Sequence, residues 1–579
     1  MKKLLVYLKD YKKECILAPL FKMLEASFEL LVPLVMANLI DNGIAYGDKG
    51  YVYRQCIILI ALGLIGLISS VTAQYFSAKA AVGYATNVRH HLFQHLMGLS
   101  FTEIDTLGTS TMITRMTSDV NQTQTGVNMF LRLFLRSPFV VFGAMVMAFT
   151  IDVKSALIFV AAIIGLSTVV FLTMAFNIPM LKDVQKKLDS VLLSTRENLT
   201  GVRVIRAFCK EEDEVIAFRN KNQNLTKKQK QSGSISGLMN PLTYVLINLA
   251  IVVLIHTGAV QVSNGILTQG QVVALYNYMS QILVELIKLA NLIITINKSL
   301  ACANRIAEVF SLQSSMEEGT YVETKEETAE NLVEFRHVCL TYAGAGEESL
   351  TDIDFSVKPG QTVGIIGGTG SGKTSLVHLI PRFYDATKGE VLLNGVNVKD
   401  YKTEELRKKI GIVMQKAVLF KGTIKSNLAW GSGENETLTD EDFIEAAKTA
   451  QALDVVEKKG GIDSEIEQSG RNLSGGQKQR LSIARALAGK PQILILDDSS
   501  SALDFATDAS LRKSIRELSY HPTVFIVSQR TSSIRHADLI LVLDDGKLVG
   551  KGTHEELLQN CEVYREIYDS QYKKEEQVS

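Results

Sequence analysis

Six long apolar stretches constrain this chain more than any other feature of its sequence. A helix that crosses a bilayer needs about 20 predominantly apolar residues, and each stretch approaches or exceeds that length. The stretches cover residues 16–40, 57–81, 134–150, 156–176, 242–262 and 272–296. They predict a membrane domain of six spanning helices, and the 579 residues are too many for one core, so at least one further domain is expected.

The loops between these stretches differ in charge. Residues 41–52, 151–154 and 263–270 are short and hold few Lys or Arg, whereas 85–130 and 180–237 are long and rich in both. The positive-inside rule places the long loops in the cytoplasm, so we expect a multi-pass protein with both termini cytoplasmic. The formal net charge of zero gives no basic surface for nucleic acid, which is not expected as a partner.

Few turn signals interrupt the second long loop. Residues 177–203 contain a single proline, Pro179, and no glycine before Gly201. We expect this segment to continue the fourth apolar helix roughly 40 Å beyond the membrane, at 1.5 Å per residue. Such an extension would carry a short loop segment far below the membrane surface.

The first apolar stretch is interrupted by Lys22, Glu25 and Glu29. A charge near the bilayer centre costs about 2.5–3.5 kcal/mol on insertion scales. We therefore expect these three side chains to lie near the inner boundary or to face protein rather than lipid.

Two further pairs of charged residues belong to other stretches. Glu285 and Lys288 are three residues apart and share one face of the sixth helix. They either line a polar cavity, pair with each other or lie at cytoplasmic depth. Arg132 and Arg136 come at the start of the third helix, where we expect them at the level of the inner headgroups.

A change of composition marks the second domain. Residues 311–331 are polar, acidic and without apolar periodicity, and we interpret them as a linker. We assign residues 1–310 to the membrane domain and 332–579 to a soluble domain. In the latter, short strand-like runs alternate with helical segments, which is typical of an α/β fold.

A glycine-rich loop in the soluble domain indicates nucleotide binding. The strand-like run 362–366 continues into GGTGSGKTS, residues 367–375, and then into a helical segment. This is the order of a P-loop, whose glycines let backbone N–H groups turn onto phosphates. Lys373 is predicted to reach the β- and γ-phosphates, and the Thr374 hydroxyl to ligate Mg²⁺. The other predicted binding residues of this loop are Gly367, Gly370, Gly372 and Ser375.

A second motif supports the first. Residues 493–497 read ILILD, a buried type of strand that ends in a carboxylate. Asp497 is predicted to lie across the sheet from the P-loop and to hold the Mg²⁺ shell. Together the two motifs predict a domain that binds ATP with Mg²⁺.

A third motif, LSGGQ at residues 473–477, precedes the second. With it the chain resembles ATP-binding-cassette (ABC) proteins. Other family elements match in order: Tyr342 for the aromatic that stacks on adenine, Gln415 for the glutamine that reaches the metal, and Asp504 for the D-loop aspartate. Residues 108–119 and 201–212 resemble the two intracellular loops of exporters with six helices in each half.

The resemblance implies an all-α transmembrane domain of the type I ABC exporter fold, fused to an α/β P-loop NTPase of the ABC type. It also implies that two such chains dimerise head to tail around two ATP molecules. Ser474, Gly476 and Gln477 would then contact the ATP held by the P-loop of the other chain. The function implied is ATP hydrolysis coupled to transport, with a second ABC half-transporter as partner.

Two positions depart from the family pattern. A catalytic glutamate usually follows the second-motif aspartate, but here the residue is Asp498; the usual switch histidine is replaced by Gln529. Asp498 keeps the charge but is one methylene shorter. Gln529 donates a hydrogen bond but carries no imidazolium charge. We therefore expect the chain's own ATP site to hydrolyse slowly.

These departures favour a heterodimer over a homodimer. The chain resembles the degenerate-site subunit of bacterial heterodimeric multidrug exporters, which implies a bacterial plasma membrane. A homodimer with slow turnover and an ATP-binding regulatory or channel-type subunit are the alternatives. The substrate class left open is lipophilic or amphipathic, namely a drug, lipid or peptide moved out of the cytoplasm or inner leaflet, and either export or lipid flipping is compatible with it. Membrane lipids are a further expected partner.

Overall fold

The structure is a computed structural model that describes residues 4–322, 329–432 and 438–576. It divides into two compact units. The first, the membrane unit, comprises Met1–Met97 and Ser110–Ser311, and the second, the nucleotide unit, comprises Gly98–Thr109 and Leu312–Ser579. The segment 98–109, which the predicted boundaries leave in the membrane domain, thus belongs to the nucleotide unit.

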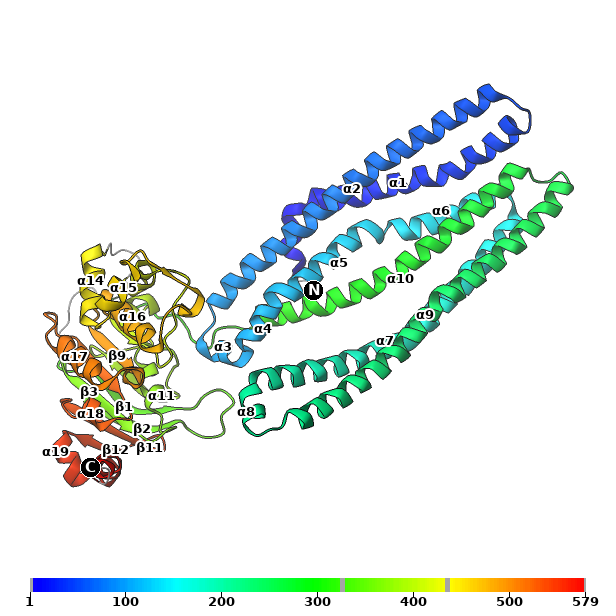
Figure 1. Cartoon of the computed structure of the whole chain (residues 1–579). Coiled ribbons are helices and arrows are strands. Elements are labelled where there is room, and N and C mark those ends of the chain that lie inside the picture. The colour runs from blue at the N-terminus through cyan, green and yellow to red at the C-terminus, as the bar shows by residue number, and fades with distance from the viewer. Residues whose placement is uncertain (1–3, 323–328, 433–437, 577–579) are drawn as a thin grey trace. The chain divides into compact units, whose positions relative to one another are not determined.

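The membrane unit is entirely helical in its described residues (Figure 1). Its helices are α1 (Lys12–Asn38, continued by a π-helical turn, Leu39–Ile44), α2 (Lys49–Met97), α4 (Thr109–Thr114), α5 (Val120–Leu133), α6 (Arg136–Ile151), α7 (Val153–Thr200), α8 (Val202–Ala207), α9 (Glu211–Ser263) and α10 (Gln269–Ser311), with a 3₁₀ segment, Leu4–Tyr11, before α1. Six helical segments of the described chain are long and apolar enough to cross a membrane, which confirms the predicted six spans.

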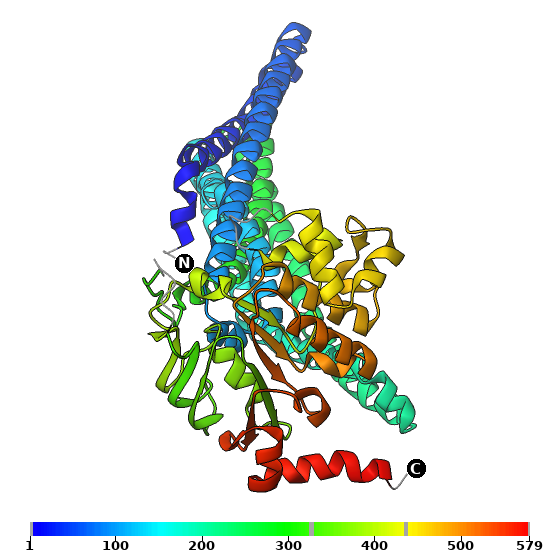
Figure 2. The same cartoon turned by 90° about the vertical axis from the view of Figure 1, so that its left-hand side faces the viewer.

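The long helices continue well beyond their apolar stretches. The helix α7 runs without a break from Val153 to Thr200, which confirms the predicted extension of the fourth span. Its start is fixed by Asp152, whose extended backbone ends the preceding helix and whose carboxylate accepts a hydrogen bond from Ser155 N at 2.7 Å. The helices α7 and α9 run side by side, and so do α1 and α2 (Figures 1 and 2).

Side-chain size distinguishes the buried face of α2 from its exposed face. Its buried positions include Ala73, Ser77 and Ala80, small residues that let a neighbouring helix approach closely. Large apolar side chains such as Ile57 and Ile60 are instead exposed. An exposed apolar face of this kind is what a lipid-facing helix requires, since lipid tails solvate it.

The charged residues of the first stretch face protein. Lys22 donates to Glu25 at 2.5 Å, and both side chains are largely buried, as the protein-facing alternative predicted. Arg136 is also buried, between Glu29 at 2.6 Å and Glu285. Carboxylates on α1 and α10 thus neutralise the guanidinium inside the unit, and its level at the inner headgroups stays a prediction.

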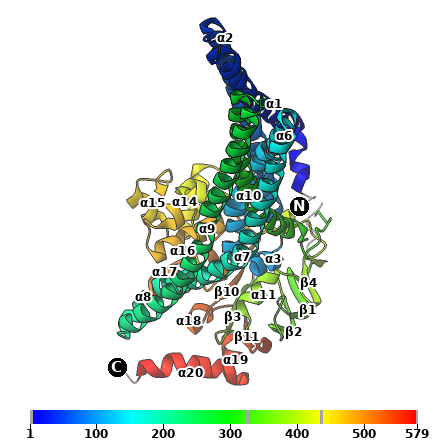
Figure 3. The same ribbon diagram turned by 90° about the vertical axis from the view of Figure 1, so that its right-hand side faces the viewer.

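The nucleotide unit is built on a six-stranded sheet and a four-stranded sheet. The larger sheet has the order β12-β11-β3-β10-β9-β6 and is parallel except for β12. Its strands are β3 (Thr362–Gly367), β6 (Ile410–Val413), β9 (Ile493–Asp497), β10 (Thr523–Val527), β11 (Leu539–Asp544) and β12 (Lys547–Gly552). The smaller sheet, β2-β1-β4-β5, contains β1 (Val333–Leu340), β2 (Leu350–Val357), β4 (Lys388–Leu393) and β5 (Val396–Asn397), of which the first three are labelled in Figure 3. A short pair joins β7 (Gly422–Thr423) and β8 (Glu465–Ile466).

Helices complete this unit and confirm its α/β class. They are α3 (Phe101–Leu107), α11 (Lys373–Leu379), α12 (Thr403–Lys408), α13 (Ile424–Leu428), α14 (Asp440–Thr449), α15 (Leu453–Lys459), α16 (Gly475–Ala488), α17 (Phe505–Arg516), α18 (Thr531–Ile534), α19 (His554–Asn560) and the C-terminal α20 (Glu562–Glu576), which is red in Figure 2.

The parallel register brings the sequence motifs to one edge of the sheet. Val527 of β10 pairs with Ile365 of β3 on one side and with Asp497 of β9 on the other. The P-loop, Asp498 and Gln529 all follow these strands directly, so they leave the sheet at neighbouring carboxyl ends. This is where ligands bind in open parallel sheets.

Candidate nucleotide-binding site

The P-loop connects β3 to α11 through a turn that glycine makes possible. Gly370 and Gly372 have φ of 87° and 91°, a left-handed conformation that other residues rarely adopt. A Cβ on Gly372 would also lie 2.8 Å from Leu350 Cδ2 and 2.9 Å from Ser349 O. The backbone therefore adopts the tight course that turns its N–H groups toward a phosphate.

Lys373, the first residue of α11, is folded against its own loop. Its ammonium donates to Gly367 O at 2.9 Å, to Gly368 O at 2.5 Å and to Ser371 Oγ at 3.3 Å. Burial lowers the pKa of Lys373, and the carboxylates of Asp497 and Asp498 act in the opposite direction. The cation is thus held at the loop by weak neutral acceptors, which a polyphosphate would replace with charged ones.

Thr374 and Asp497 meet across the sheet edge, as the motifs predicted. The Thr374 hydroxyl donates to Asp497 Oδ1 at 3.0 Å. Asp497 is 1% exposed at the end of β9, and burial raises the pKa of its carboxyl against the lowering effect of that hydrogen bond. A nearby cation would offset this burial of charge.

The donor set suits Mg²⁺. A hydroxyl, a carboxylate and the side-chain oxygen of Gln415 are hard oxygen ligands, which Mg²⁺ takes together with phosphate oxygens. Gln415 lies close enough for its Nε2 to donate to Asp498 Oδ2 at 3.3 Å. Among the described residues no cluster of three or more His, Cys, Asp and Glu side chains is placed to hold a metal ion.

These residues line one cavity of about 780 Å³, called here the nucleotide cavity. Its lining combines Gly370, Gly372, Lys373, Thr374, Ser375, Gln415, Asp497, Asp498 and Gln529 with residues 345–349, Thr369, Val527, Asp545 and Gly546. The structure therefore brings together P-loop, second-motif, glutamine and switch positions that lie up to 159 residues apart, from Gly370 to Gln529.

Asp498 occupies a constrained position in the nucleotide cavity. Its φ is 45° and its ψ is 31°, a left-handed conformation for a residue with a Cβ. Its backbone N–H is held by Val527 O at 3.1 Å, next to the switch residue Gln529. The two departures from the family pattern thus flank one site.

The residues of the third motif and the D-loop aspartate Asp504 lie outside the nucleotide cavity. The nucleotide cavity is lined by none of Ser474, Gly476, Gln477 and Asp504. Ser474 caps α16: its Oγ accepts from Gln477 N at 3.3 Å, and Gln477 Oε1 accepts from Ser474 N at 2.9 Å. Asp504 caps α17 through Thr507 N at 2.7 Å. The signature is therefore preformed but not part of the chain's own site.

Tyr342 lies beside the P-loop helix. Its hydroxyl donates to Ser375 Oγ at 2.9 Å, and its ring meets that of Tyr384 edge to face at 4.9 Å. The Tyr384 hydroxyl in turn donates to Asp105 Oδ2 of α3 at 2.6 Å. Sequence reasoning missed this contact, although two adjacent aromatic residues, Phe383 and Tyr384, were a visible signal.

The same aromatic group reaches Asp497. Phe383 packs against Phe101 of α3 at 4.6 Å and against His378 of α11 at 5.3 Å. His378 Nε2 lies 3.9 Å from Asp497 Oδ2, and burial lowers the pKa of this imidazole, so it is neutral near pH 7. The α3 segment is thus packed on side chains that adjoin both Tyr342 and the Asp497 carboxylate.

Gln571 of α20 was also missed. Its Nε2 donates to Gln529 O at 2.7 Å, and its Oε1 accepts from Thr531 N at 2.9 Å and from the Thr531 hydroxyl at 2.8 Å. The C-terminal helix therefore holds the switch segment in place. No motif marks this residue in the sequence.

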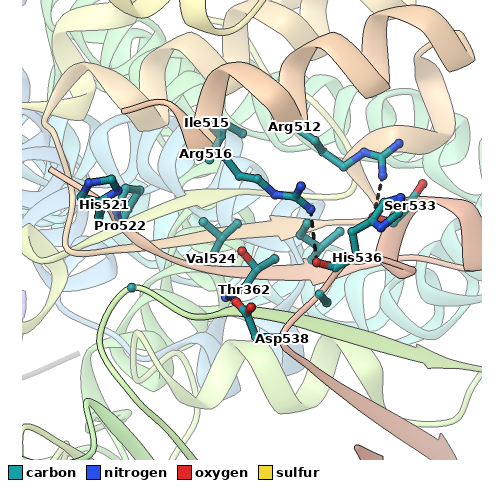
Figure 4. Close-up of a pocket in the computed structure, with 13 residues that line it drawn as sticks. Thr362, Arg512, Ile515, Arg516, His521, Pro522, Val524, Ser533, His536 and Asp538 are labelled. Atoms are coloured by element: carbon teal, nitrogen blue, oxygen red, sulfur yellow. Dashed lines mark hydrogen bonds between the residues drawn. The ribbon is translucent and has the colours of Figure 1, made fainter. Parts of the chain in front are cut away.

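A second cavity of about 300 Å³ lies at the other end of the central strands (Figure 4). Its basic side chains already have acceptors in the chain. Arg512 Nη1 donates to Ser532 O at 3.0 Å and Ser533 O at 3.1 Å, and Arg516 Nη2 donates to His536 O at 3.2 Å. None of the motif residues lines it, so the nucleotide cavity is the candidate functional site.

Fold and site together define a P-loop nucleotide-binding unit fused to a six-helix membrane unit. Family models agree: residues 15–286 match the ABC transporter transmembrane region, and residues 350–501 match ABC transporter. The chain is 36% identical over 577 residues to the uncharacterized ABC transporter ATP-binding protein YfiB of Bacillus subtilis (99% of both chains). It belongs to the ABC transporter family.

Other relatives point to exporters. The chain is 28% identical to the ATP-dependent lipid A-core flippase of Haemophilus ducreyi, covering 99% of this chain and 98% of that one. Its fold resembles a bacterial Atm1-family ABC exporter solved with ATP bound, with a TM-score of 0.78 and 23% identity over 97% of this chain and 98% of that one. The chain thus has the type I exporter fold expected from its sequence.

Proposed function

We propose that this chain is one subunit of an ATP-driven exporter that moves a lipophilic or amphipathic molecule out of the cytoplasm or the inner leaflet. Its membrane is a bacterial plasma membrane, with both termini and the nucleotide unit in the cytoplasm, as the charges of the long loops favour. The relative named as a lipid A-core flippase supports a lipid as one possible class of cargo, beside drugs and peptides.

The assembly proposed is a heterodimer with unequal ATP sites. One observation carries it: Asp498 and Gln529 both line the nucleotide cavity with Lys373, while the capped signature residue Ser474 lies outside that cavity. Both departures therefore fall on the chain's own site. The signature LSGGQ, which would complete the partner's site, keeps its family sequence.

At its own site the chain is equipped to bind ATP more than to cleave it. The Lys373 ammonium and the P-loop N–H groups offset the phosphate charge. Thr374, Asp497 and Gln415 would hold Mg²⁺, which would supply further positive charge to the phosphates. The Asp498 carboxylate, one methylene short, is drawn back about 1 Å from an attacking water. A displacement of that size costs about a hundredfold in rate, or about 2.7 kcal/mol.

At the partner's site the chain supplies the far side of the γ-phosphate. Ser474 and the first N–H groups of α16 present the positive end of a 14-residue helix. Donors fixed in this way stabilise charge that develops during cleavage. ATP binding then closes the two nucleotide units, the membrane helices open outward, and hydrolysis at the partner's site resets them.

Two other assemblies use the same residues differently. A homodimer would place Asp498 and Gln529 at both sites and turn over slowly. A regulatory or channel-type subunit would bind ATP without driving transport. The well-formed capping box of Ser474 and Gln477 favours the exporter, since it equips a second chain for hydrolysis.

The composition of the native complex tests the assembly. The full chain carries an affinity tag at its chromosomal locus, and the complex is extracted in mild detergent and weighed intact by native mass spectrometry. The expected mass is one copy of this chain plus one different six-span ABC chain that has glutamate and histidine at the positions of Asp498 and Gln529. Two copies of this chain would contradict the heterodimer.

A further inference from the structure

The membrane unit contains a cavity of about 480 Å³ between α1 and α10, called here the membrane cavity. This volume lies within the range of about 300–1,000 Å³ that small-molecule sites occupy. Its α1 wall is mainly apolar, with Val32, Pro33 and Met36, whereas its α10 wall is mainly polar. A cavity of this composition suits a ligand with an apolar and a polar part.

Gln281, Glu285 and Lys288 line the α10 wall together. They are spaced by four and three residues, so they share one face of the helix. Glu29 of α1 also lines the cavity. The structure therefore meets two of the alternatives for Glu285 and Lys288, because they pair at 2.8 Å and also line a polar cavity.

These charges belong to a charged cluster of three carboxylates, Glu25, Glu29 and Glu285, and three cations, Lys22, Arg136 and Lys288. Arg136 is at its centre and contacts all three carboxylates. The cluster has no net charge, so a ligand of one sign would be attracted by some members and repelled by others.

Two members of the cluster retain capacity for a ligand. The Glu29 side chain is 40% exposed and binds Arg136 through Oε2, which leaves Oε1 as an acceptor. Lys288 is 42% exposed and uses one of its three N–H donors on Glu285 Oε1. By contrast, both oxygens of Glu285 are engaged, by Arg136, Lys288 and Ser137. The free acceptor and the free donors thus carry opposite charge.

A further acceptor in the wall is unsatisfied. Gln281 Oε1 is buried and has no hydrogen-bond partner among the described residues. Leaving a buried acceptor unpaired is unfavourable. Because this oxygen has almost no exposed surface, a rotation of the Gln281 side chain toward the membrane cavity would let a ligand N–H satisfy it.

We propose that the membrane cavity binds the zwitterionic head of an amphipathic molecule, with a primary ammonium at Glu29 and Gln281 and an anionic phosphate at Lys288. The apolar part of the molecule then lies along Val32, Pro33 and Met36. The inference rests on the proposed export function and narrows its cargo to molecules with an ammonium–phosphate head.

The test measures binding by the full chain in detergent, without ATP. Four probes share one fluorescent acyl chain and differ in the head: phosphoethanolamine, phosphocholine, phosphoglycerol and a bare primary amine. The phosphoethanolamine probe is expected to bind about tenfold more tightly than each of the other three. Phosphocholine has both charges but no N–H, so it isolates the contribution of the ammonium hydrogen bonds to Glu29 and Gln281.

Single substitutions assign the two ends of the head. Glu29→Gln is expected to weaken the two probes with an ammonium N–H about tenfold, to weaken phosphocholine less because it loses only the charge attraction, and to leave phosphoglycerol unchanged. Lys288→Met should weaken the three phosphate probes and spare the amine, while Gln281→Leu should weaken phosphoethanolamine but not phosphocholine. Lys298→Met, an exposed lysine on the same helix, is the matched control and should change none.

Equal affinity for the four probes would overturn the inference, and so would substitutions that shift all four by one factor. If a variant does not fold, Glu29→Asp or Lys288→Arg replaces it, with retained head selectivity expected. Binding is measured without ATP, so its failure leaves the proposed export intact. Failure of ATP-driven transport with normal probe selectivity would instead contradict the proposed function alone.

Discussion

The nucleotide cavity and the charged cluster both bury ionic side chains, but they balance them differently. In the nucleotide cavity, Lys373 is held by two carbonyls and a hydroxyl, and Asp497 by the Thr374 hydroxyl. In the charged cluster, every carboxylate lies within 4 Å of a cation. The charges of the nucleotide cavity therefore lack charged partners within the part of the chain that the structure describes, as a site for a polyphosphate and a metal requires. Most charges of the charged cluster are already paired with one another.

This difference determines how much binding free energy a charged ligand can gain at each region. A buried ion without a charged partner gains strongly when a ligand of opposite sign arrives. A neutral cluster offers only its spare donors and acceptors, so it selects by pattern rather than by net charge. Substitutions at the two regions should accordingly fail in different ways.

The largest effect is expected from Arg136→Met, which removes the cation that Glu29 and Glu285 share. The buried Glu285 would lose its main counter-ion, and breaking a buried pair from one side costs about 3–5 kcal/mol. Thermal unfolding of the purified chain in detergent measures the loss. Arg132→Met is the control, since Arg132 forms no ion pair within the described chain; an equal loss from both would show that the cluster contributes no specific stability.

The next effect is expected from Lys373→Ala. Among the described residues the ammonium donates only to its own loop. Its removal should therefore leave thermal stability nearly unchanged but weaken ATP binding about a hundredfold, or about 2.7 kcal/mol. Titration with a fluorescent ATP analogue measures this, with Lys513→Ala on the surface of α17 as control. A large loss of stability with normal ATP affinity would reverse the contrast between the two regions.

A smaller effect is expected from Tyr384→Phe, which deletes the hydroxyl bound to Asp105 of α3. An exposed hydrogen bond to a carboxylate contributes about 1 kcal/mol. Amide hydrogen exchange in α3 should therefore quicken about fivefold, with ATP affinity unaltered. Unchanged exchange in α3 would mean that the aromatic packing of Phe101 and Phe383 alone holds the segment.

The smallest effect is expected from Gln571→Ala. It removes the partly exposed side-chain bonds to Gln529 O and Thr531, which together contribute about 0.5–1 kcal/mol. Exchange at residues 529–531 should quicken while the P-loop is unaffected. Gln559→Ala on α19 serves as control, and the role of Gln571 is refuted if the two variants behave alike.

The same contrast explains what the sequence could reveal. Lys373, Thr374 and Asp497 sit in short motifs whose spacing is dictated by a strand, a turn and a helix, so their meeting was predictable. Arg136, Glu29 and Glu285 come from three helices 107 and 149 residues apart, and no local pattern fixes which faces of those helices meet. The ion pairs of Arg136 were therefore not predictable, while its level at the inner headgroups stays a prediction.

The contacts of Gln571 and Asp105 also depend on packing between distant segments, so the sequence did not predict them. Each acts through a single hydrogen-bond pattern with residues at least 40 positions away, and neither lies in a recognisable motif. The departures at Asp498 and Gln529 were visible because the surrounding motifs set the expected residue. Their common location in the nucleotide cavity needed the structure.

We propose unequal roles for the chain's own P-loop site and for the signature that it offers to a partner. ATP turnover of the native complex, measured with a substitution in one or the other, tests these roles most directly. Asp498→Asn alters only the chain's own site, and Ser474→Arg blocks only the site completed for the partner. If the two sites are unequal, the ATP turnover rate should fall about threefold or less with Asp498→Asn and about a hundredfold or more with Ser474→Arg. Equal losses, as two equivalent sites require, would contradict these unequal roles.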